Sequence, residues 1–257
     1  GAVCAQLRFA DGRLQEAGGI VWSDGSAWNW GRGENPRHPR FNYPREVDYG
    51  SAAALMVPRK LWERLGGFDE DFAPAYYEDT DLCFAIRSFG HRVIYQPLAV
   101  VTHLEGVSHG TDIGVGIKAY QVCNKQRFAD KWNQVLRQHR ANGVEPMLER
   151  DRPARARILW VEACMLTPDQ DSGSLRTIRL LRILVRMGCK VTYVADNLDG
   201  AEPYRSQLTY EGIEVIHAPF FSSVSDYLTQ HGAEFDIVTL CRHYIAIQHL
   251  KTVRDVN

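Results

Sequence analysis

The sequence of 257 residues predicts an α/β protein in two parts, a mixed α/β part followed by a part built on a parallel sheet. From about residue 156 onward, short apolar runs alternate with amphipathic helical segments, at the spacing of strand–helix–strand units. Between residues 137 and 157 the chain is rich in arginine and poor in large apolar side chains, which is typical of a linker. We therefore expect a first domain over residues 1–140, a linker over 141–155 and a second domain over 156–257.

The composition is that of a globular chain without a strongly charged partner. Hydrophobic residues make up 45% of the sequence and the formal net charge is −1, which gives no support to nucleic-acid binding. No apolar run approaches the roughly 18 residues of a transmembrane helix, and no signal-peptide pattern is present. The chain starts at Gly1 without an initiator methionine, so we expect a piece of a longer protein.

Cysteine usage and the basic linker bear on the location of the protein. The six cysteines form no CxxC pair and no zinc-binding spacing, and several lie inside apolar runs, where a free thiol behaves as a small hydrophobe. We therefore expect a reducing compartment, the cytoplasm. The arginines of the linker predict a solvated connector. The alternative is that they contact a nucleotide, or anionic lipid in a peripheral association with a membrane.

The first part contains two clear helices among shorter elements. The glycine- and tryptophan-rich stretch 18–33 is typical of a loop, and residues 51–57 form an apolar run of small side chains. PRKLWERLGG predicts a short helix with Pro58 at its start and Gly66 just past its end. Apolar residues at helical spacing predict a second helix that begins near Glu78 and ends at Gly90. RVIYQP and AVVTH are then expected as two short strands.

The second part alternates strand and helix. Strands are expected in RILWVEA, KVTYVAD, IEVIHAP and FDIVTLC. Helices are expected in SLRTIRLLRILVRMG, PYRSQLTYEG and SDYLTQHG, and from about Tyr244 onward. This order predicts a parallel sheet of the Rossmann type. Four strands are few for a complete doubly wound domain.

An acidic cluster is the strongest chemical signal. GGFDEDF and YYEDTDL together place six carboxylates within thirteen residues, 69–81. Acids favour the first turn of a helix because they cap free N–H groups and complement the helix dipole, and this explanation alone accounts for the spacing. Alternatively, a carboxylate held there beside a pocket acts as a general base. His103, at the end of a strand, is either a metal ligand beside this site or a hydrogen-bonded core histidine.

The order of these motifs points to a known family. The segment GSAAALMVPRKLWERLGGFDEDFAPAYYEDTDLCFAIRSFGHRVIYQPLAVVTHLEG, within residues 45–110, closely resembles the C-terminal half of family 2 inverting glycosyltransferases, which have the GT-A fold. The small-residue run, the GGFDE turn, the ED-x-D helix start and the strand-end histidine together make the resemblance specific.

The resemblance implies roles for individual residues. Asp79, with Glu78 beside it, matches the catalytic base that deprotonates the acceptor hydroxyl. His103 matches a ligand of the divalent cation, Mn²⁺ or Mg²⁺, that neutralises the departing nucleoside diphosphate. Asp81 is expected to support the helix start. The resemblance also implies that Gly50, Ser51, Gly67 and Asp69 contact the substrates. Trp28 and Trp30 are further candidates, because the aromatic rings of a loop either stack on a sugar or cover a core.

One departure from the family pattern concerns the metal and the nucleotide. The family's DxD motif lies earlier than any residue matched here. The D-x-D strings of this chain begin at Asp69, Asp79 and Asp169; the first two belong to elements already assigned and the third to the other half. The donor-binding segment is therefore expected to be missing. We predict that this chain alone binds donor poorly and turns over slowly or not at all.

The second part resembles the N-terminal Rossmann-like domain of GT-B glycosyltransferases, most nearly family 4, from about residue 156 to the end. The resemblance rests on PDQDSGS-x-R after the first strand and on the element order. No GxGxxG is present, which disfavours dinucleotide binding. Ser172, Gly173 and Ser174 open a helix, where they either bind an anion or a sugar hydroxyl or simply cap the helix. Asp169, Asp171 and His243 are further candidates for lining a pocket.

The leading hypothesis is a fragment of a glycosyltransferase, with a GT-A part followed by an incomplete GT-B part, that acts in polysaccharide biosynthesis. Its partners would be a nucleotide-sugar donor and a glycan or lipid-linked glycan acceptor. The alternatives are a non-catalytic glycan-binding or scaffolding module derived from such enzymes and a metal-dependent phosphoesterase. The phosphoesterase needs more ligands near the cluster than the sequence supplies.

Overall fold

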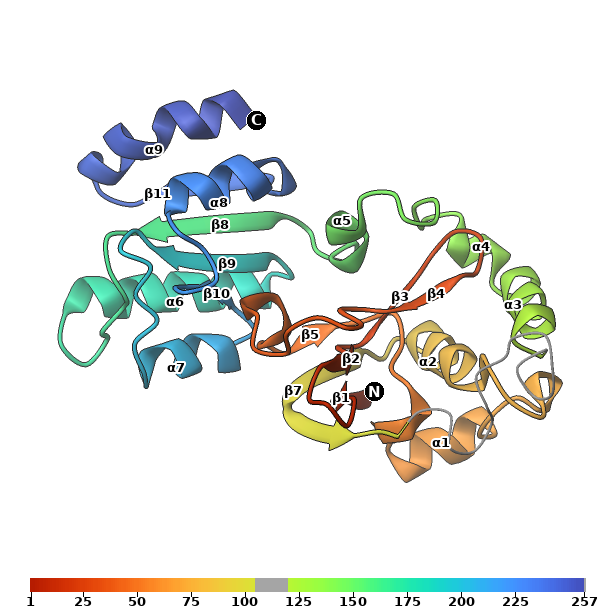
Figure 1. The fold of residues 1–257 in the computed structure, drawn as a ribbon. Coiled ribbons are helices and arrows are strands. Elements are labelled where there is room, and N and C mark those ends of the chain that lie inside the picture. The colour runs from red at the N-terminus through yellow and green to blue at the C-terminus, as the bar shows by residue number, and fades with distance from the viewer. Residues whose placement is uncertain (105–119, 257) are drawn as a thin grey trace. The chain divides into compact units, whose positions relative to one another are not determined.

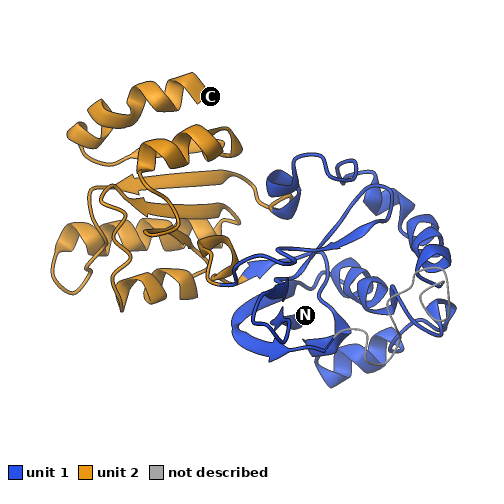
Figure 2. Ribbon diagram, in the orientation of Figure 1, with its two compact units in different colours: residues 1–36, 45–150 blue, residues 37–44, 151–257 orange. Residues whose placement is uncertain are grey.

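The computed structural model describes residues 1–104 and 120–256 and divides the chain into two compact units (Figure 1, Figure 2). Unit 1 comprises Gly1–Pro36 and Arg45–Arg150, and unit 2 comprises Arg37–Pro44 and Asp151–Asn257. A mixed sheet with helices is followed by a parallel sheet with helices, so the predicted fold class is confirmed. Residues 105–110, where the resemblance to family 2 glycosyltransferases ends, lie outside the described residues.

Unit 1 is built on a mixed sheet of order β2-β1-β7-β5, in which β6 also pairs with β1. The strand β1 (Ala2–Arg8) runs parallel to β7 (Val93–Thr102) and antiparallel to β2 (Leu14–Glu16) and β6 (Leu55–Met56), and β5 (Arg45–Glu46) is antiparallel to β7. The β1–β2 register shifts between Leu7 and Arg8, which pair with Glu16 and Leu14. Gln15 is therefore the extra residue of a bulge, a feature that re-aims side chains.

The two strands expected over residues 92–103 are one strand, β7. Its pairing with β1 passes from Ala5–Gln96 directly to Gln6–Val100, so the strand is irregular between these pairs. Pro97 lies in the interruption, and proline has no N–H group to give to a β ladder. The proline therefore interrupts the pairing without ending the strand.

The stretch 18–33, expected as a loop, contains a hairpin of β3 (Gly19–Val21) and β4 (Ala27–Asn29). The amide of Trp22 donates to the Ser26 carbonyl at 2.8 Å, and Gly25 has a φ of 77° that favours glycine. Trp22 is fully buried. Glycine supplies the turn and tryptophan the core contact, so the composition that suggested a loop builds a hairpin.

The predicted helices of unit 1 are confirmed. The first, α1 (Arg59–Leu65), follows Pro58 and ends at Gly66 in the left-handed conformation, and the second, α2 (Glu78–Ser88), lies just before Gly90. The small-residue run folds into the 3₁₀ helix η2 (Ala52–Ala54) and then β6, while η3 (Glu70–Phe72) lies in the acidic segment. Among the described residues, the remaining helices of unit 1 are α3 (Tyr120–Lys131), α4 (Asn133–Leu136) and α5 (Pro146–Arg150).

Helix α5 lies where a linker was expected. Both Glu149 and Arg150 are buried within unit 1. This end of the basic segment is therefore not a solvated connector, because its charged side chains take part in the interior of the unit. The unit boundary lies between Arg150 and Asp151.

Unit 2 has a four-stranded, fully parallel sheet of order β10-β9-β8-β11. Its strands are β8 (Arg157–Glu162), β9 (Lys190–Ala195), β10 (Glu214–Ile216) and β11 (Ile237–Leu240). The helices are α6 (Ser172–Arg186), α7 (Tyr204–Tyr210), α8 (Val224–His231) and α9 (His243–Val256), with the 3₁₀ helix η5 (Gly232–Glu234) after α8. The predicted strand–helix alternation of this part is confirmed.

Helices cover both faces of the unit 2 sheet (Figure 1). Leu181 of α6 and Leu208 of α7 pack with Val191 and Tyr193 of β9 in one apolar cluster. On the other face, residues of α8 and α9 pack with Val194 in a second cluster. Alternate residues of one strand point to opposite faces, so β9 contributes to both clusters and appears in the sequence as a continuous apolar run.

A short segment from the first part of the chain belongs to unit 2. Residues 37–44 contain the 3₁₀ helix η1 (Pro39–Phe41), which packs against β10. Nζ of Lys190 lies 4.6 Å from the ring centroid of Tyr43, and the ring of His38 meets that of Phe220 edge-on at 5.3 Å. Unit 2 is therefore completed by residues more than a hundred positions before its first strand.

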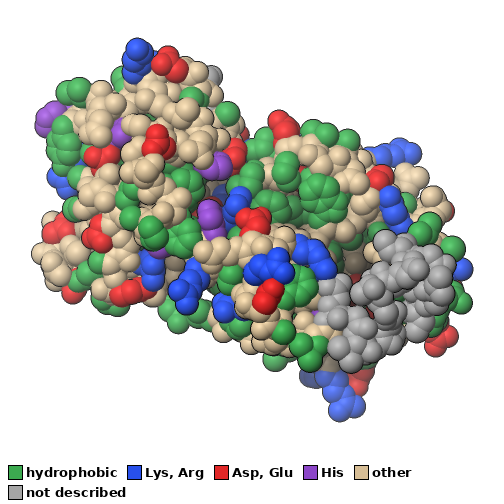
Figure 3. Space-filling model, in the orientation of Figure 1, with side chains coloured by type: hydrophobic (Ala, Val, Ile, Leu, Met, Phe, Trp, Pro, Cys, Tyr) green, Lys and Arg blue, Asp and Glu red, His purple; other side chains and the backbone are tan. Residues whose placement is uncertain are grey.

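Charged side chains of both signs are scattered over the face drawn in Figure 3, as the net charge of −1 leads one to expect. In the described part of the chain, no helix combines the length and the apolarity needed to cross a membrane.

Candidate functional site

The start of α2 is held in an unusual backbone conformation. Tyr76 and Tyr77, the two residues before the helix, have φ values of 74° and 71°, a region that costs free energy for residues other than glycine. Buried Asn124 of α3 compensates, because its side-chain amide donates to the carbonyls of Phe72, Ala75 and Tyr76 at 2.8, 3.0 and 3.0 Å. Helix α3 thus fixes the turn that presents the first residues of α2.

Asp79 is half-buried and points toward the small-residue run. Its Oδ2 accepts a hydrogen bond from the backbone amide of Ala52 at 3.0 Å. Its Oδ1 accepts from the amide and hydroxyl of Thr80 at 2.7 and 3.2 Å. Burial raises the pKa of Asp79, although these hydrogen bonds oppose the rise. The result is an oriented carboxylate that binds a proton more tightly than an exposed aspartate.

Glu78 is half-buried in the same first turn of α2. Gly50 and Ser51 directly precede η2, and a Cβ on Gly50 would lie 2.2 Å from the Cβ of Cys4. Gly50 therefore has a packing reason to be glycine, independent of any ligand. The amide of Ser51 faces a residue that sequence reasoning missed.

That residue is Glu16 in β2. It is only 1% exposed, and its Oε1 accepts from the Ser51 amide at 2.9 Å. Burial, with the nearby charge of Asp79 as a smaller cause, raises the pKa of Glu16 to about 8. No sequence signal singles it out, because a lone glutamate in a three-residue strand is ordinary until the fold buries it.

His103 follows β7 and is half-buried. Its backbone amide donates to the Arg8 carbonyl at 2.9 Å, and its Nδ1 lies 3.1 Å from Oε1 of Gln15. Gln15 and Glu16 are consecutive in β2. Gln15 contacts His103, and Glu16 interacts electrostatically with Asp79. The family-based assignment of His103 as a metal ligand stays a prediction.

Two further acids of the cluster, Asp69 and Asp81, share an ion pair with Lys131. Nζ of Lys131 lies 2.7 Å from the Asp69 carboxylate and 2.8 Å from that of Asp81, and Nε1 of Trp132 donates to Asp81 at 2.7 Å. Buried Asp81 therefore anchors the end of α3 to α2, which agrees with a supporting role. Asp69 also accepts from the Asp71 amide, and Gly67 sits in the left-handed conformation against the Trp62 ring.

Trp28 and Trp30, expected either to stack on a sugar or to cover a core, differ in exposure. Trp28 is 41% exposed and meets the Trp22 ring edge-on at 4.8 Å. Trp30 is only 8% exposed, and the guanidinium of Arg150 lies over its ring at 5.5 Å. Trp30 is therefore a core residue whose ring face is already covered, whereas Trp28 keeps an exposed surface.

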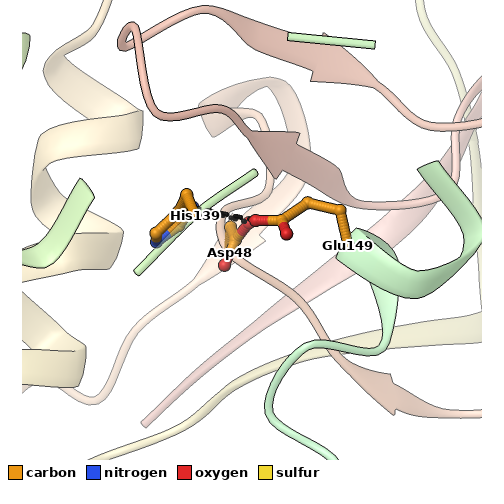
Figure 4. A group of neighbouring side chains, drawn as sticks. All are labelled: Asp48, His139 and Glu149. Carbon is orange, nitrogen blue, oxygen red and sulfur yellow. Dashed lines mark ion pairs between the residues drawn. The ribbon is translucent and has the colours of Figure 1, made fainter. Parts of the chain in front are cut away.

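A second group of ionisable residues joins the β5 region to the end of unit 1 (Figure 4). One ligand atom of each of Asp48, His139 and Glu149 lies within 4.8 Å of the others, and all three residues are buried. Such a group can hold a metal ion in principle. Nδ1 of His139 lies 2.6 Å from the Val21 carbonyl, an acceptor, and 3.2 Å from Glu149.

The charges around this group favour an ion-pair network over a cation site. The proton that Nδ1 donates to the carbonyl occupies the atom that would bind the metal. Asp48 pairs with Arg87 at 3.0 Å and Glu149 with Arg140 at 3.3 Å. Two arginines already balance the two carboxylates, so a divalent cation would add uncompensated positive charge to a buried site.

In unit 2, α6 is capped by Asp171, whose carboxylate accepts from the Ser174 amide at 2.8 Å. The alternative in which Ser172 or Ser174 caps the helix is therefore wrong. The binding of an anion or a sugar hydroxyl by Ser172, Gly173 and Ser174 stays a prediction. Ser172 and Gly173 are exposed in the first turn. Oδ2 of Asp169 accepts from the hydroxyl of Tyr204 at 3.2 Å, and exposed His243 begins α9.

No protein-family model matches the chain. Over 97 residues, 36% of the chain, it is 32% identical to N-acetylglucosaminyl-diphospho-decaprenol L-rhamnosyltransferase of Mycobacterium tuberculosis. Over 117 residues, 44% of the chain, it is 31% identical to the O-antigen biosynthesis protein RfbC of Myxococcus xanthus. It is also 29% identical over 114 residues, 43% of the chain, to the uncharacterized protein y4gI of Sinorhizobium fredii.

These alignments cover 31%, 9% and 12% of the three relatives, so the chain spans less than a third of each. Over 36–44% of its own length, the chain is thus similar to proteins that include a glycosyltransferase and an O-antigen biosynthesis protein. This supports the glycosyltransferase resemblance at the level of the general class. The fusion of a GT-A part with a GT-B part stays a prediction.

Proposed function

We propose that unit 1 is the acceptor-side part of an inverting GT-A glycosyltransferase that acts in polysaccharide biosynthesis. The observation that carries this proposal is the Asp79 carboxylate, held at the start of α2 by the Ala52 amide with its pKa raised by burial. A general base is most effective when its pKa approaches the working pH. Burial shifts the pKa of Asp79 upward, in that direction, and the hydrogen bond from the Ala52 amide fixes the orientation of its carboxylate.

In the proposed reaction, the hydroxyl of the acceptor loses its proton to Asp79. The acceptor oxygen attacks the anomeric carbon of the donor sugar as the bond from that carbon to the phosphate oxygen breaks. The nucleoside diphosphate leaves with the bonding electrons, and a single in-line displacement inverts the anomeric centre. A bound Mn²⁺ or Mg²⁺ would neutralise the leaving diphosphate, and His103 would help to hold it.

The identities of the substrates are proposals drawn from the relatives. The mycobacterial relative is named for L-rhamnosyl transfer and for a diphospho-decaprenol-linked sugar. We therefore propose a nucleotide-sugar donor and a glycan or lipid-linked glycan acceptor. The six free cysteines are compatible with the cytoplasmic location proposed from the sequence.

The test uses this chain extended at its N-terminus by the donor-binding segment that the family resemblance implies, screened with nucleotide sugars in the presence of Mn²⁺ or Mg²⁺. Asp79→Asn should lower kcat by roughly 10²- to 10⁴-fold, the usual contribution of a general base, while the Kd for the donor stays near that of the unsubstituted protein. Exposed Asp71→Asn, in the same acidic cluster, is the matched control and should keep most of the activity. Near-normal turnover by Asp79→Asn would remove Asp79 as the base.

A non-catalytic glycan-binding module is the competing function. It predicts that the extended protein binds glycans without consuming any nucleotide sugar, and that Asp79→Asn leaves glycan binding unchanged. Absence of turnover with every donor, together with retained glycan binding, would favour this alternative.

A further inference from the structure

A second carboxyl group lies beside the proposed base. We propose that Glu16 is a positioning residue for Asp79: Glu16 remains uncharged next to the ionised base and fixes the Gly50–Ser51 peptide, which adjoins the Ser51–Ala52 peptide whose N–H orients Asp79. The catalytic half of this inference rests on the proposed function of Asp79, whereas the charge state of Glu16 does not.

The geometry couples the two carboxyl groups through one stretch of backbone. The Ser51 amide donates to Oε1 of Glu16 at 2.9 Å, and the next amide, of Ala52, donates to Oδ2 of Asp79 at 3.0 Å. Two consecutive N–H groups thus hold the two carboxyl groups. If loss of Glu16 lets the Ser51 amide move, the adjacent Ala52 amide moves with it, and the Asp79 carboxylate that this amide binds is displaced.

The hydrogen-bond partners indicate which group carries the negative charge. Asp79 accepts from three donors, the amides of Ala52 and Thr80 and the hydroxyl of Thr80. Glu16 accepts from one, and its Oε2 is buried without a hydrogen-bond partner among the described residues. A buried unpaired carboxylate oxygen is costly, and a proton on Oε2 removes the charge. One negative charge in the pair is therefore expected to reside on Asp79.

The other ionisable groups around Glu16 do not alter this assignment. Arg32 stabilises the ionised form of Glu16, but its effect is smaller than that of burial and of the charge on Asp79. The remaining neighbours are neutral thiols and a phenol at pH 7. Within residues 1–104 and 120–256, the titratable and charged groups that interact electrostatically with Glu16 are Cys4, Arg32, Tyr49, Asp79 and Cys83.

A neutral Glu16 leaves a single negative charge beside the acceptor hydroxyl. Glutamine has the same shape, keeps a carbonyl oxygen for the Ser51 amide and cannot ionise. Glu16→Gln should therefore preserve the positioning function, whereas Glu16→Ala removes the acceptor for the Ser51 amide. The contrast between these variants separates positioning from ionisation.

The charge state is tested without turnover, on the chain as it stands. Infrared difference spectroscopy should detect a protonated carboxyl group at pH 7 that is lost in Glu16→Gln and that disappears in the unsubstituted chain with a midpoint of about 8. Asp69→Gln is the control and should leave this band intact. If no protonated carboxyl band depends on Glu16 at pH 7, the inference is overturned.

The positioning role is tested in the extended protein. Glu16→Ala should lower kcat by roughly 10- to 100-fold, as expected for misplacement of a catalytic group, and Glu16→Gln should restore it. The acidic limb of the kcat/KM profile should coincide in Glu16→Gln and the unsubstituted protein. A limb displaced to lower pH in Glu16→Gln would show that Glu16 carries charge while the base titrates, which contradicts the inference. If the extended protein has no activity, the proposed function fails, while the infrared measurement still decides the charge state of Glu16.

Discussion

Glu16 and Asp79 are held by consecutive backbone amides, although 63 positions separate them in the chain (79 − 16). The Ser51–Ala52 segment that joins them belongs to the small-residue run. The family resemblance predicts that Ser51 in this run contacts the substrates. The structure gives this run a second role, because its N–H groups orient two carboxyl groups. Small side chains suit this role because they let neighbouring elements approach the backbone closely, as Cys4 approaches Gly50.

The side chain of Asn124 should be essential for the stability of the turn before α2, whose carbonyls accept its three hydrogen bonds. Asn124→Ala removes three hydrogen bonds to carbonyls before α2 and should lower the free energy of unfolding of unit 1 by about 2–4 kcal/mol, because these buried and part-buried carbonyls lose their donor. Urea denaturation followed by tryptophan fluorescence measures the change. Exposed Gln126→Ala on the same helix is the control and should change the free energy of unfolding by no more than about 0.5 kcal/mol. Equal effects of the two substitutions would show that the hydrogen bonds of Asn124 do not stabilise this turn.

Phe41 should stabilise unit 2 although it lies in the first fifth of the sequence. Its side chain is fully buried in η1, which packs against β10. Phe41→Ala should destabilise unit 2 by about 3–5 kcal/mol, the usual effect of emptying an aromatic site in a core. Amide hydrogen exchange should accelerate in β8, β9 and β10 and not in β1 and β7. Phe89→Ala, at a 47% exposed position of unit 1, should leave both sheets unchanged.

The stability of unit 2 should fall on acidification. Burial, and next the charge of Arg40, lowers the pKa of His38 to about 4, whereas an unfolded histidine titrates near 6.5. Between these values the unfolded chain binds more protons than the folded one, so the free energy of unfolding rises with pH. His217, whose pKa is also lowered mainly by burial, adds to the same trend.

This pH dependence can be assigned with a single substitution. The difference between the urea midpoints of unit 2 at pH 7.5 and pH 5 should narrow in His38→Gln, whatever that substitution does to the midpoint at pH 7.5. Exposed His91→Gln should leave the difference unchanged. If His38→Gln leaves the difference between the two midpoints unaltered, His38 is not the histidine responsible for the pH dependence.

Two histidines of unit 1 should respond differently to metal. In the extended protein, His103→Ala should raise the Mn²⁺ concentration for half-maximal activity by roughly 10- to 100-fold, the effect of losing a group that helps to hold a metal. His139→Ala should lower stability and leave the Mn²⁺ requirement unchanged, because Nδ1 of His139 donates to the Val21 carbonyl and its partners are balanced by arginines. A Mn²⁺ requirement that depends on His139 would instead make the Asp48–His139–Glu149 group the metal site.

Local patterns in the sequence determined the elements whose contacts are close in the chain. The helices α1 and α2 follow from apolar spacing, from Pro58 and from glycines past their ends. The parallel sheet of unit 2 follows from strand–helix alternation, because strands covered on both faces appear as unbroken apolar runs. The position of Asp79 in the first turn of a helix was likewise visible from the sequence.

Tertiary structure alone decided which distant residues meet. Residues 37–44 complete unit 2, Asn124 binds carbonyls 48–52 positions away, and the amide of Ser51 binds Glu16 from 35 positions away. Trp30 is covered by Arg150, and Asp171 rather than a serine caps α6. A sequence pattern reports the environment of a residue along its own helix or strand. Burial, which raises the pKa of Glu16 and Asp79, is produced by side chains from other elements, so it exists only once the chain has folded.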